Sequence, residues 1–331
     1  MSMGQVCLIV LAVVVGLAMI LYLSCLLLFR TGTEVAFHFA EPELTLKPSS
    51  NPTVMAMCAM LEQGTQWAEE QSFQTVHIRS RDGLTLAGHW LPCADARRTV
   101  VLFHGWKGNW KEHLVVLGSF LQAQRCSLLF VEQRAHGESE GKYLGFGVLE
   151  RYDCLEWVRW IQDNTPKGRP IYLMGGSLGA TTVLMTSGFD LPEQVHGIVA
   201  DCGFVSAEEQ IGQTLKDWWH LPRQPFLWIA DHIARRKAGF SFWEYSTLKA
   251  METNTKPILF VHGLDDRFVL PEGTVKNYNA CRAEKDLLLD VLPLKPFLIK
   301  PNNHELGQMF GRKLKTEDEI IECAKELQDR G

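Results

Sequence analysis

Hydrophobic and polar positions follow three different patterns along the chain, and the first is a long apolar run near the N-terminus. From Val6 to Phe29 no residue is charged. About 20 apolar residues in a helix cross the hydrocarbon core of a bilayer, so this run predicts a membrane-spanning helix. A cleaved signal peptide has a basic start, a shorter apolar core and a small-residue cleavage site, and none of these is found here. We expect an anchor at residues 1–30, with a buried core helix as the alternative.

The second pattern is an alternation of apolar and polar residues. It runs from Phe73 to Arg79 and again from Leu84 to Trp90, on either side of Asp82-Gly83. Alternation on both sides of an Asp-Gly pair predicts an antiparallel hairpin. The residues before it, 31–72, are expected to form a connector that contains a short helix at 53–70.

The third pattern consists of short, continuous apolar runs separated by segments with helical periodicity. Strands that are buried on both faces of a parallel sheet have this appearance. The pattern predicts an α/β domain at residues 73–331, built on a mainly parallel, doubly wound sheet with an antiparallel start. The runs are Val100–Phe103, Leu128–Val131, Ile171–Met174, Ile198–Ala200, Ile258–Val261 and Phe297–Ile299.

Composition limits the classes of partner and cofactor. The chain has 331 residues and a net charge of −5, without a run of Lys or Arg, which argues against a nucleic-acid surface. No cluster of His, Cys or Asp has the spacing of metal ligands, so we expect neither a metal nor another cofactor. Nine scattered cysteines without a C-x-x-C pair indicate reduced thiols. Together with Arg30 and Lys47 just beyond the apolar run, they favour the cytoplasmic side for the rest of the chain.

A candidate for chemistry lies where the apolar run at 171–174 ends. The sequence Gly175-Gly176-Ser177-Leu178-Gly179 is a G-x-S-x-G motif, and a segment compatible with a helix follows it. A sharp turn from strand to helix presents the serine hydroxyl as a nucleophile. Glycines fit where such a turn leaves no room for a Cβ, and the amide of Leu178 is left free to stabilise an oxyanion.

Two glycine-containing loops follow the earlier strands. In the first, His104-Gly105-Trp106, the amide of Trp106 is a candidate for the second oxyanion donor. The second loop, residues 132–139, carries His136, which we interpret as a structural hydrogen-bonding residue because a later histidine fits the chain order better.

A nucleophilic serine needs a base and an acid that orients the base. Beyond the strand at 258–261 come Asp265 and Asp266, and beyond the run at 297–299 comes His304. Asp201, at the end of the run at 198–200, is an alternative acid. These positions predict an acid and a base at strand ends, in the order serine, acid, histidine.

These residues resemble the α/β-hydrolase superfamily over residues 73–330. The sequence is similar to its serine aminopeptidase-like branch and to membrane-anchored bacterial relatives of unassigned substrate. The resemblance rests on HGWKGN at 104–109, EQRAHGESEG at 132–141, GGSLG at 175–179, DCGF at 201–204, HGLDD at 262–266 and NNHE at 302–305. It implies the α/β-hydrolase fold with Ser177 as nucleophile, His304 as base and Asp266, the fifth residue of H-G-x-x-D, as acid. The sequence departs from the family at PNNHE, where Gly-Gly-His is more usual.

An aromatic-rich segment at about 203–250 separates two of the predicted strands. It contains Trp218, Trp219, Trp228 and Trp243. Two interpretations stay open: a small helical cap with its own core, or a cap whose aromatic residues also line an acyl pocket.

The function expected from these patterns is that of a serine hydrolase acting on an ester, thioester or amide. A carboxylesterase or lipase-like activity leads, and a peptidase-like hydrolase or a non-catalytic anchored binding protein of the same fold are the alternatives. The expected partners are an acyl substrate and the membrane around residues 6–29.

Overall fold

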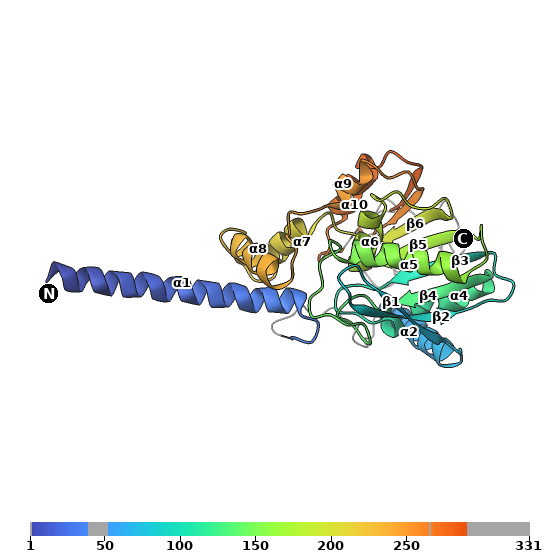
Figure 1. The fold of residues 1–331 in the computed structure, drawn as a ribbon, viewed down its shortest axis with the longest axis horizontal. Coiled ribbons are helices and arrows are strands. Elements are labelled where there is room, and N and C mark those ends of the chain that lie inside the picture. The colour runs from blue at the N-terminus through green and yellow to red at the C-terminus, as the bar shows by residue number, and fades with distance from the viewer. Residues whose placement is uncertain (1, 39–51, 265, 290–331) are drawn as a thin grey trace.

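An eight-stranded sheet forms the centre of the protein in this computed structural model, which describes residues 2–38, 52–264 and 266–289 (Figure 1). The order of the strands across the sheet is β1-β2-β4-β3-β5-β6-β7-β8. The strands are β1 (Gln74–Arg79), β2 (Thr85–Leu91), β3 (Arg98–Phe103), β4 (Cys126–Val131), β5 (Ile171–Gly176), β6 (Val195–Asp201), β7 (Ile258–Val261) and β8 (Lys285–Leu288).

The direction of the strands follows the predicted pattern. The hairpin β1–β2 is antiparallel, with Ile78 opposite Leu86, and β2 also pairs antiparallel with β4. All other neighbours in the sheet are parallel. The carboxyl ends of β3 to β8 therefore meet at one edge, which is where open parallel sheets carry their ligand sites.

Helices cover both faces of the sheet. On β3, Val101 belongs to a core cluster with residues of α5, α6 and α9, whereas Val100 and Leu102 belong to a cluster with residues of α2 and α3. This alternation is the period of two that a strand buried on both faces requires. The helices are α2 (Pro52–Glu69), α3 (Trp110–His113), α4 (Gly118–Ala123), α5 (Glu150–Asn164), α6 (Leu178–Thr186), α9 (Thr247–Met251) and α10 (Pro271–Ala280), with a short 3-10 helix at Val115–Leu117.

The strand β8 was not predicted from the sequence. It pairs parallel with β7 at the edge of the described sheet, with Val261 opposite Leu288. Its first residues, Lys285 and Asp286, are charged, as is common for an edge strand, and they hide the apolar pattern. The predicted strand at 297–299 and the predicted final helix, which opens at Thr316, lie outside the described residues.

The longest helix, α1 (Met3–Thr33), includes the predicted anchor. It is long and apolar enough to cross a membrane by length and composition. Most of its large side chains are exposed as far as Leu23, which is 54% exposed, whereas Leu21 is partly buried and Cys25 and Phe29 are buried. In Figure 1, α1 projects from the body of the protein as a rod that ends beside the helices α7 and α8. Only the C-terminal part of this helix therefore packs on the rest of the protein.

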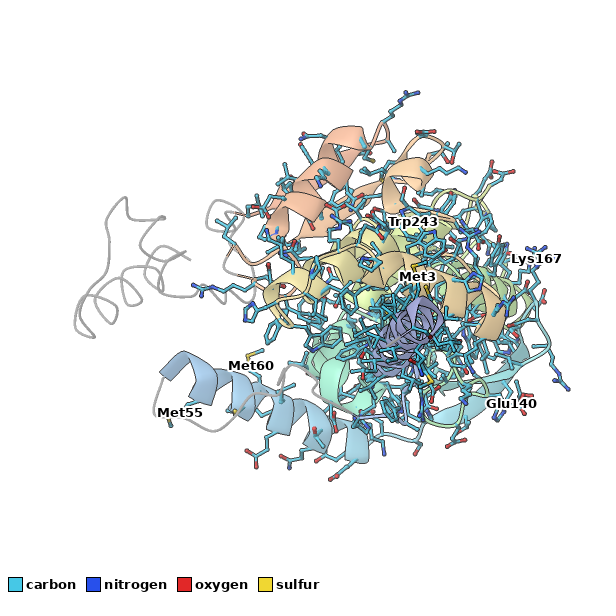
Figure 2. The ribbon with its side chains drawn as sticks, turned by 90° about the vertical axis from the view of Figure 1, so that its left-hand side faces the viewer. Met3, Met55, Met60, Glu140, Lys167 and Trp243 are labelled. Carbon is cyan, nitrogen blue, oxygen red and sulfur yellow. The ribbon has the colours of Figure 1, made fainter. Side chains whose placement is uncertain are left out.

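Two helices form the predicted cap between β6 and β7. They are α7 (Ala207–Asp217), which Ser206 caps through its side chain, and α8 (Phe226–Lys237). Phe204, Leu215 and Leu227 are buried in one cluster with Cys25 and Phe29 of α1. Figure 2 looks along α1 from its N-terminal end at Met3 and shows the cap helices beside it. The cap and the end of α1 thus share one apolar core.

Candidate active site

Ser177 lies in a sharp turn between β5 and α6. Its backbone is in a rare conformation, with φ 53° and ψ −114°. A Cβ added to Gly175 would lie 2.2 Å from the carbonyl carbon of Gly179, and one added to Gly179 would lie 2.1 Å from the carbonyl oxygen of Phe103. No real Cβ tolerates such distances, so both glycines are required for strand and helix to approach this closely. The turn is the nucleophile elbow that the motif predicts.

The elbow is held by its neighbours in the sheet. The amide of Ser177 donates to the carbonyl of Asp201 at the end of β6, 2.8 Å away. Thr181 on α6 exchanges hydrogen bonds with the backbone of Phe204, where the cap begins. Leu178 is the first residue of α6, so its amide has no partner within the helix. This amide and the positive end of the helix dipole favour negative charge beside Ser177.

The loop after β3 places Trp106 at the same edge of the sheet. Gln133 fixes this loop, because its side chain donates to the carbonyl of His104 at 2.6 Å and its amide donates to His104 Nε2 at 3.1 Å. The indole of Trp106 donates to the carbonyl of Gly32, 2.8 Å away on α1. The ring of Trp106 also lies 6.2 Å from that of Phe268, in the loop after β7. Trp106 therefore links three parts of the site.

Asp266 lies in the loop after β7, and backbone amides hold one oxygen of its carboxylate. Oδ1 accepts from the amides of Phe268 at 2.8 Å and Val269 at 2.9 Å. Oδ2 lies 3.7 Å from Nε2 of the buried His262. Among the described residues, no hydrogen bond of 3.5 Å or less reaches Oδ2, so this oxygen can accept from a further histidine.

The charge of Asp266 follows from these contacts. Burial alone would raise the pKa of its carboxyl group, but His262 and the amides of Val269 and Phe268 outweigh that effect. The net pKa lies below its usual value. The carboxylate is therefore ionised at neutral pH, as a group that orients an imidazolium must be.

His136 has a structural environment. It is buried, and its Nδ1 lies 2.8 Å from the carbonyl oxygen of Arg134. Burial lowers its pKa. Arg134 itself pairs with Asp153 at 2.7 Å and with Asp82 at 3.0 Å, which fixes the loop to α5 and to the turn of the hairpin. These contacts agree with the interpretation of His136 as a structural residue.

One pocket connects the elbow, the cap and α1. The space between its lining residues, its open mouth included, is about 830 Å³. Among the described residues that line it, none is charged. They are Cys25, Leu28, Phe29, Thr31, Gly32, Thr33, Trp106, Phe146, Ser177, Leu178, Phe204, Gln210, Ile211, Thr214, Leu215, Trp219, Phe226, Ala230, Phe242, Phe268 and Val269.

The pocket brings together three of the residues proposed from the sequence: Trp106, Ser177 and Leu178. Asp266 is not among the lining residues, but Phe268 and Val269, whose amides donate to its carboxylate, line the pocket. His304 and Asp265 lie outside the described residues. Aromatic residues of the cap line the pocket, so the cap forms a pocket wall, and its apolar core is shared with the end of α1. The wall formed by the end of α1 was not expected, because an apolar helix looks the same in sequence whether lipid or protein covers it.

Comparisons with known proteins agree with this architecture. Residues 98–227 match the family model described as alpha/beta hydrolase fold. Over 212 residues the chain is 29% identical to an uncharacterized protein of Bacillus subtilis, YqkD, and the match covers 64% of this chain and 69% of that protein. The esterase Pf2001 of Pyrococcus furiosus superposes with a TM-score of 0.52 and 24% identity, over 68% of this chain and 88% of the esterase.

A short match of a different kind concerns 46 residues. This stretch is 56% identical to D-tagatose-1-phosphate kinase of Bacillus licheniformis and makes up 14% of this chain, but it spans only 15% of the kinase. Such a fraction is too small to carry the fold or activity of a kinase. The eight-stranded sheet, the sharp turn at Ser177 and the family model all agree, and the chain has the α/β-hydrolase fold.

Proposed function

We propose that this protein is a serine hydrolase with Ser177 as its nucleophile and a carboxylesterase or lipase-like activity. The observation that carries the proposal is the strained elbow at Ser177, which opens into an uncharged pocket that the residues of both candidate oxyanion donors also line. Strain of this kind is retained in proteins mainly where function requires it.

The reaction follows from the positions of these groups. Ser177 Oγ attacks the carbonyl carbon of an ester while a base takes its proton, and the amides of Leu178 and Trp106 stabilise the oxyanion. The carbonyl re-forms, the alcohol leaves with the proton from the base, and an acyl-enzyme remains. Water then attacks the acyl group, the base takes its proton and returns it to Ser177, and the carboxylic acid is released.

Asp266 is proposed to orient the base. Its Oδ2 is available, and its ionised state suits the stabilisation of an imidazolium. His304 as the base stays a prediction from chain order, since no comparison and no described residue bears on it. Asp201 ends β6, where its backbone carbonyl accepts from the amide of Ser177, and its carboxylate stays the alternative acid.

The pocket favours an acyl ester over a peptide. A peptidase that recognises a charged terminus needs an opposite charge in its site, and the described lining residues supply none. An apolar pocket with a few polar groups near the reacting atoms suits a hydrocarbon chain that ends in an ester.

The test is labelling with a fluorophosphonate, which reacts with activated serines, together with hydrolysis of p-nitrophenyl butyrate. Wild type and Ser246→Ala should be labelled and active, because Ser246 only caps α9 outside the pocket. Ser177→Ala should show neither. Equal labelling of Ser177→Ala, or a wild type that neither labels nor hydrolyses short esters, would contradict the proposal, and the second result would favour a binding protein. Retained labelling in His304→Gln would remove His304 from the mechanism.

We also propose that α1 anchors the protein in a membrane, with the catalytic domain on the cytoplasmic side. The exposed apolar surface of α1 supports the anchor, and the burial of its last turns against the cap argues against its removal as a signal sequence. The protein should stay with membranes during alkaline carbonate extraction. Digestion of the domain by protease added to the periplasmic or luminal side would reverse the orientation.

A further inference from the structure

The environment of α1 changes near Leu23, where a mostly exposed stretch gives way to buried residues. The stretch from Met3 to Leu23, in which only Gly16 and Leu21 are partly buried, has 21 residues, which at 1.5 Å per residue is about 31 Å. The hydrocarbon core of a bilayer is about 30 Å thick. The first charged residue, Arg30, follows one and a half turns after the buried Cys25 and pairs with Glu34 at 3.1 Å. A bilayer that covers the exposed stretch therefore ends where the folded domain begins.

The remaining turns of α1 form part of the pocket. Leu28, Phe29 and Gly32 line the same pocket as Ser177. Opposite them, the cap contributes further apolar side chains, among them Trp219. The wall nearest the proposed bilayer surface is thus a continuation of the helix that crosses it.

The end of α1 is also bonded to the loop that carries Trp106. The indole of Trp106 holds the carbonyl of Gly32, and the amide of Leu144 donates to the carbonyl of Thr33 at 2.9 Å. The ammonium group of Lys107 donates to the carbonyl of Phe37 at 2.5 Å. These bonds fix the position of α1 relative to the elbow.

The outer surface of the cap carries residues that suit contact with lipid headgroups. α8 packs beside α1 and carries Trp228, which is 66% exposed. Its last turn ends with Arg236 and Lys237, both exposed. Tryptophan and basic residues are enriched where a membrane meets water and anionic lipids.

We propose that the pocket takes the long acyl chain of a membrane lipid ester directly from the bilayer, with α1 as both anchor and pocket wall. This inference rests on the proposed serine hydrolase function. Each methylene group that enters water raises the free energy of the chain, so a passage from lipid to an apolar pocket without an aqueous step lowers the barrier for a long chain. The pocket at the foot of α1 provides that passage.

The test uses the full chain in phosphatidylcholine vesicles, with 1-palmitoylglycerol in the vesicles as the long substrate and p-nitrophenyl butyrate as the short one. Leu28→Trp narrows the pocket, and we expect the ratio of long-chain to short-chain kcat/KM to fall tenfold or more. Leu23→Trp, the same change on the exposed part of the helix, should leave the ratio within twofold. An unchanged ratio in Leu28→Trp would overturn the proposal. Should Leu28→Trp fail to fold, Leu28→Ala replaces it, with a smaller fall expected and an unchanged ratio again contradicting the proposal.

The source of the chain is tested with palmitoyl-coenzyme A added in solution. We expect slower turnover of this soluble thioester than of the ester embedded in the vesicle, and faster turnover would overturn entry from the bilayer. A failure of the proposed serine hydrolase function would give a different result. In that case wild type turns over neither the short nor the long ester and is not labelled by fluorophosphonate.

Discussion

The pocket has two walls that are built in different ways. The catalytic wall consists of Trp106, Ser177 and Leu178 at the edge of the sheet, whereas the outer wall consists of the end of α1 and the cap. Backbone atoms in close contact define the catalytic wall, and one carbon added to Gly175 or Gly179 has no space. The outer wall is made of apolar side chains, which adjust to substitutions at graded cost. A change should therefore act nearly all-or-none on the first wall and gradually on the second.

The largest effect is expected at Gly179, with Gly176 as its control. Gly179→Ala puts a Cβ 2.1 Å from the carbonyl oxygen of Phe103 at the end of β3, so β3 and α6 cannot keep their positions. We expect loss of cooperative unfolding and of fluorophosphonate labelling. A Cβ on Gly176 meets nothing within 4 Å, and Gly176→Ala should stay folded, as thermal unfolding can show. If both variants behave alike, the catalytic wall is less rigid than its geometry implies.

Asp266→Asn should act on chemistry rather than on folding. In a serine protease, an asparagine in place of the orienting acid lowers kcat about 10⁴-fold, because the histidine takes the wrong tautomer. Hydrolysis of p-nitrophenyl butyrate by purified Asp266→Asn measures the effect here. Asp265→Asn and Asp201→Asn should keep most activity. A crippled Asp201→Asn beside an active Asp266→Asn would move the acid one strand earlier.

Trp106→Phe tests the bond between the two walls. It removes the hydrogen bond to Gly32 and keeps the backbone amide that is proposed to bind the oxyanion. One hydrogen bond contributes about 0.5–1.5 kcal/mol, so we expect kcat/KM to fall by up to about tenfold. Trp243→Phe changes an exposed tryptophan outside the pocket and should have no effect. A loss of several hundredfold in Trp106→Phe would mean that α1 determines the geometry of the catalytic wall.

The smallest effect concerns stability at low pH. The pKa of Asp266 is lower in the folded protein, so its carboxylate stabilises the fold above the unfolded pKa of about 3.9, and this contribution is lost as the pH falls through the folded pKa. The difference in Tm between wild type and Asp266→Asn should be constant above about pH 5 and shrink below pH 4. A difference that grows towards low pH would contradict the lowered pKa.

Local patterns in the sequence predicted most of the sheet and the sharp turn at Ser177. The hairpin around Gly83, the buried runs and the elbow at Ser177 each depend on neighbouring residues, so their signals are short-range. The strand β8 was not predicted, because Lys285 and Asp286 interrupt its apolar pattern at the sheet edge. His304 stays a prediction, because the family model ends at residue 227 and the described residues end at 289.

The outer wall could not be predicted in the same way. From Val6 to Phe29 the sequence is uncharged and only Gly16, Tyr22 and Ser24 interrupt its apolar character, which does not mark Cys25 as the point where burial begins. The bond from Trp106 to Gly32 joins residues 74 positions apart and leaves no local pattern. Such contacts depend on how elements distant in the sequence pack together.

The bond between Trp106 and Gly32 also determines when the pocket can form. A nascent chain leaves the ribosome with its N-terminus first, so α1 is complete before any of its partners in the pocket has been made. Trp106 follows Gly32 by 74 positions, and the cap residue Phe242 lies more than 200 positions after the end of α1. The growing chain therefore has no complete pocket during most of its synthesis, and the proposed activity can begin only after the domain has folded onto the end of α1.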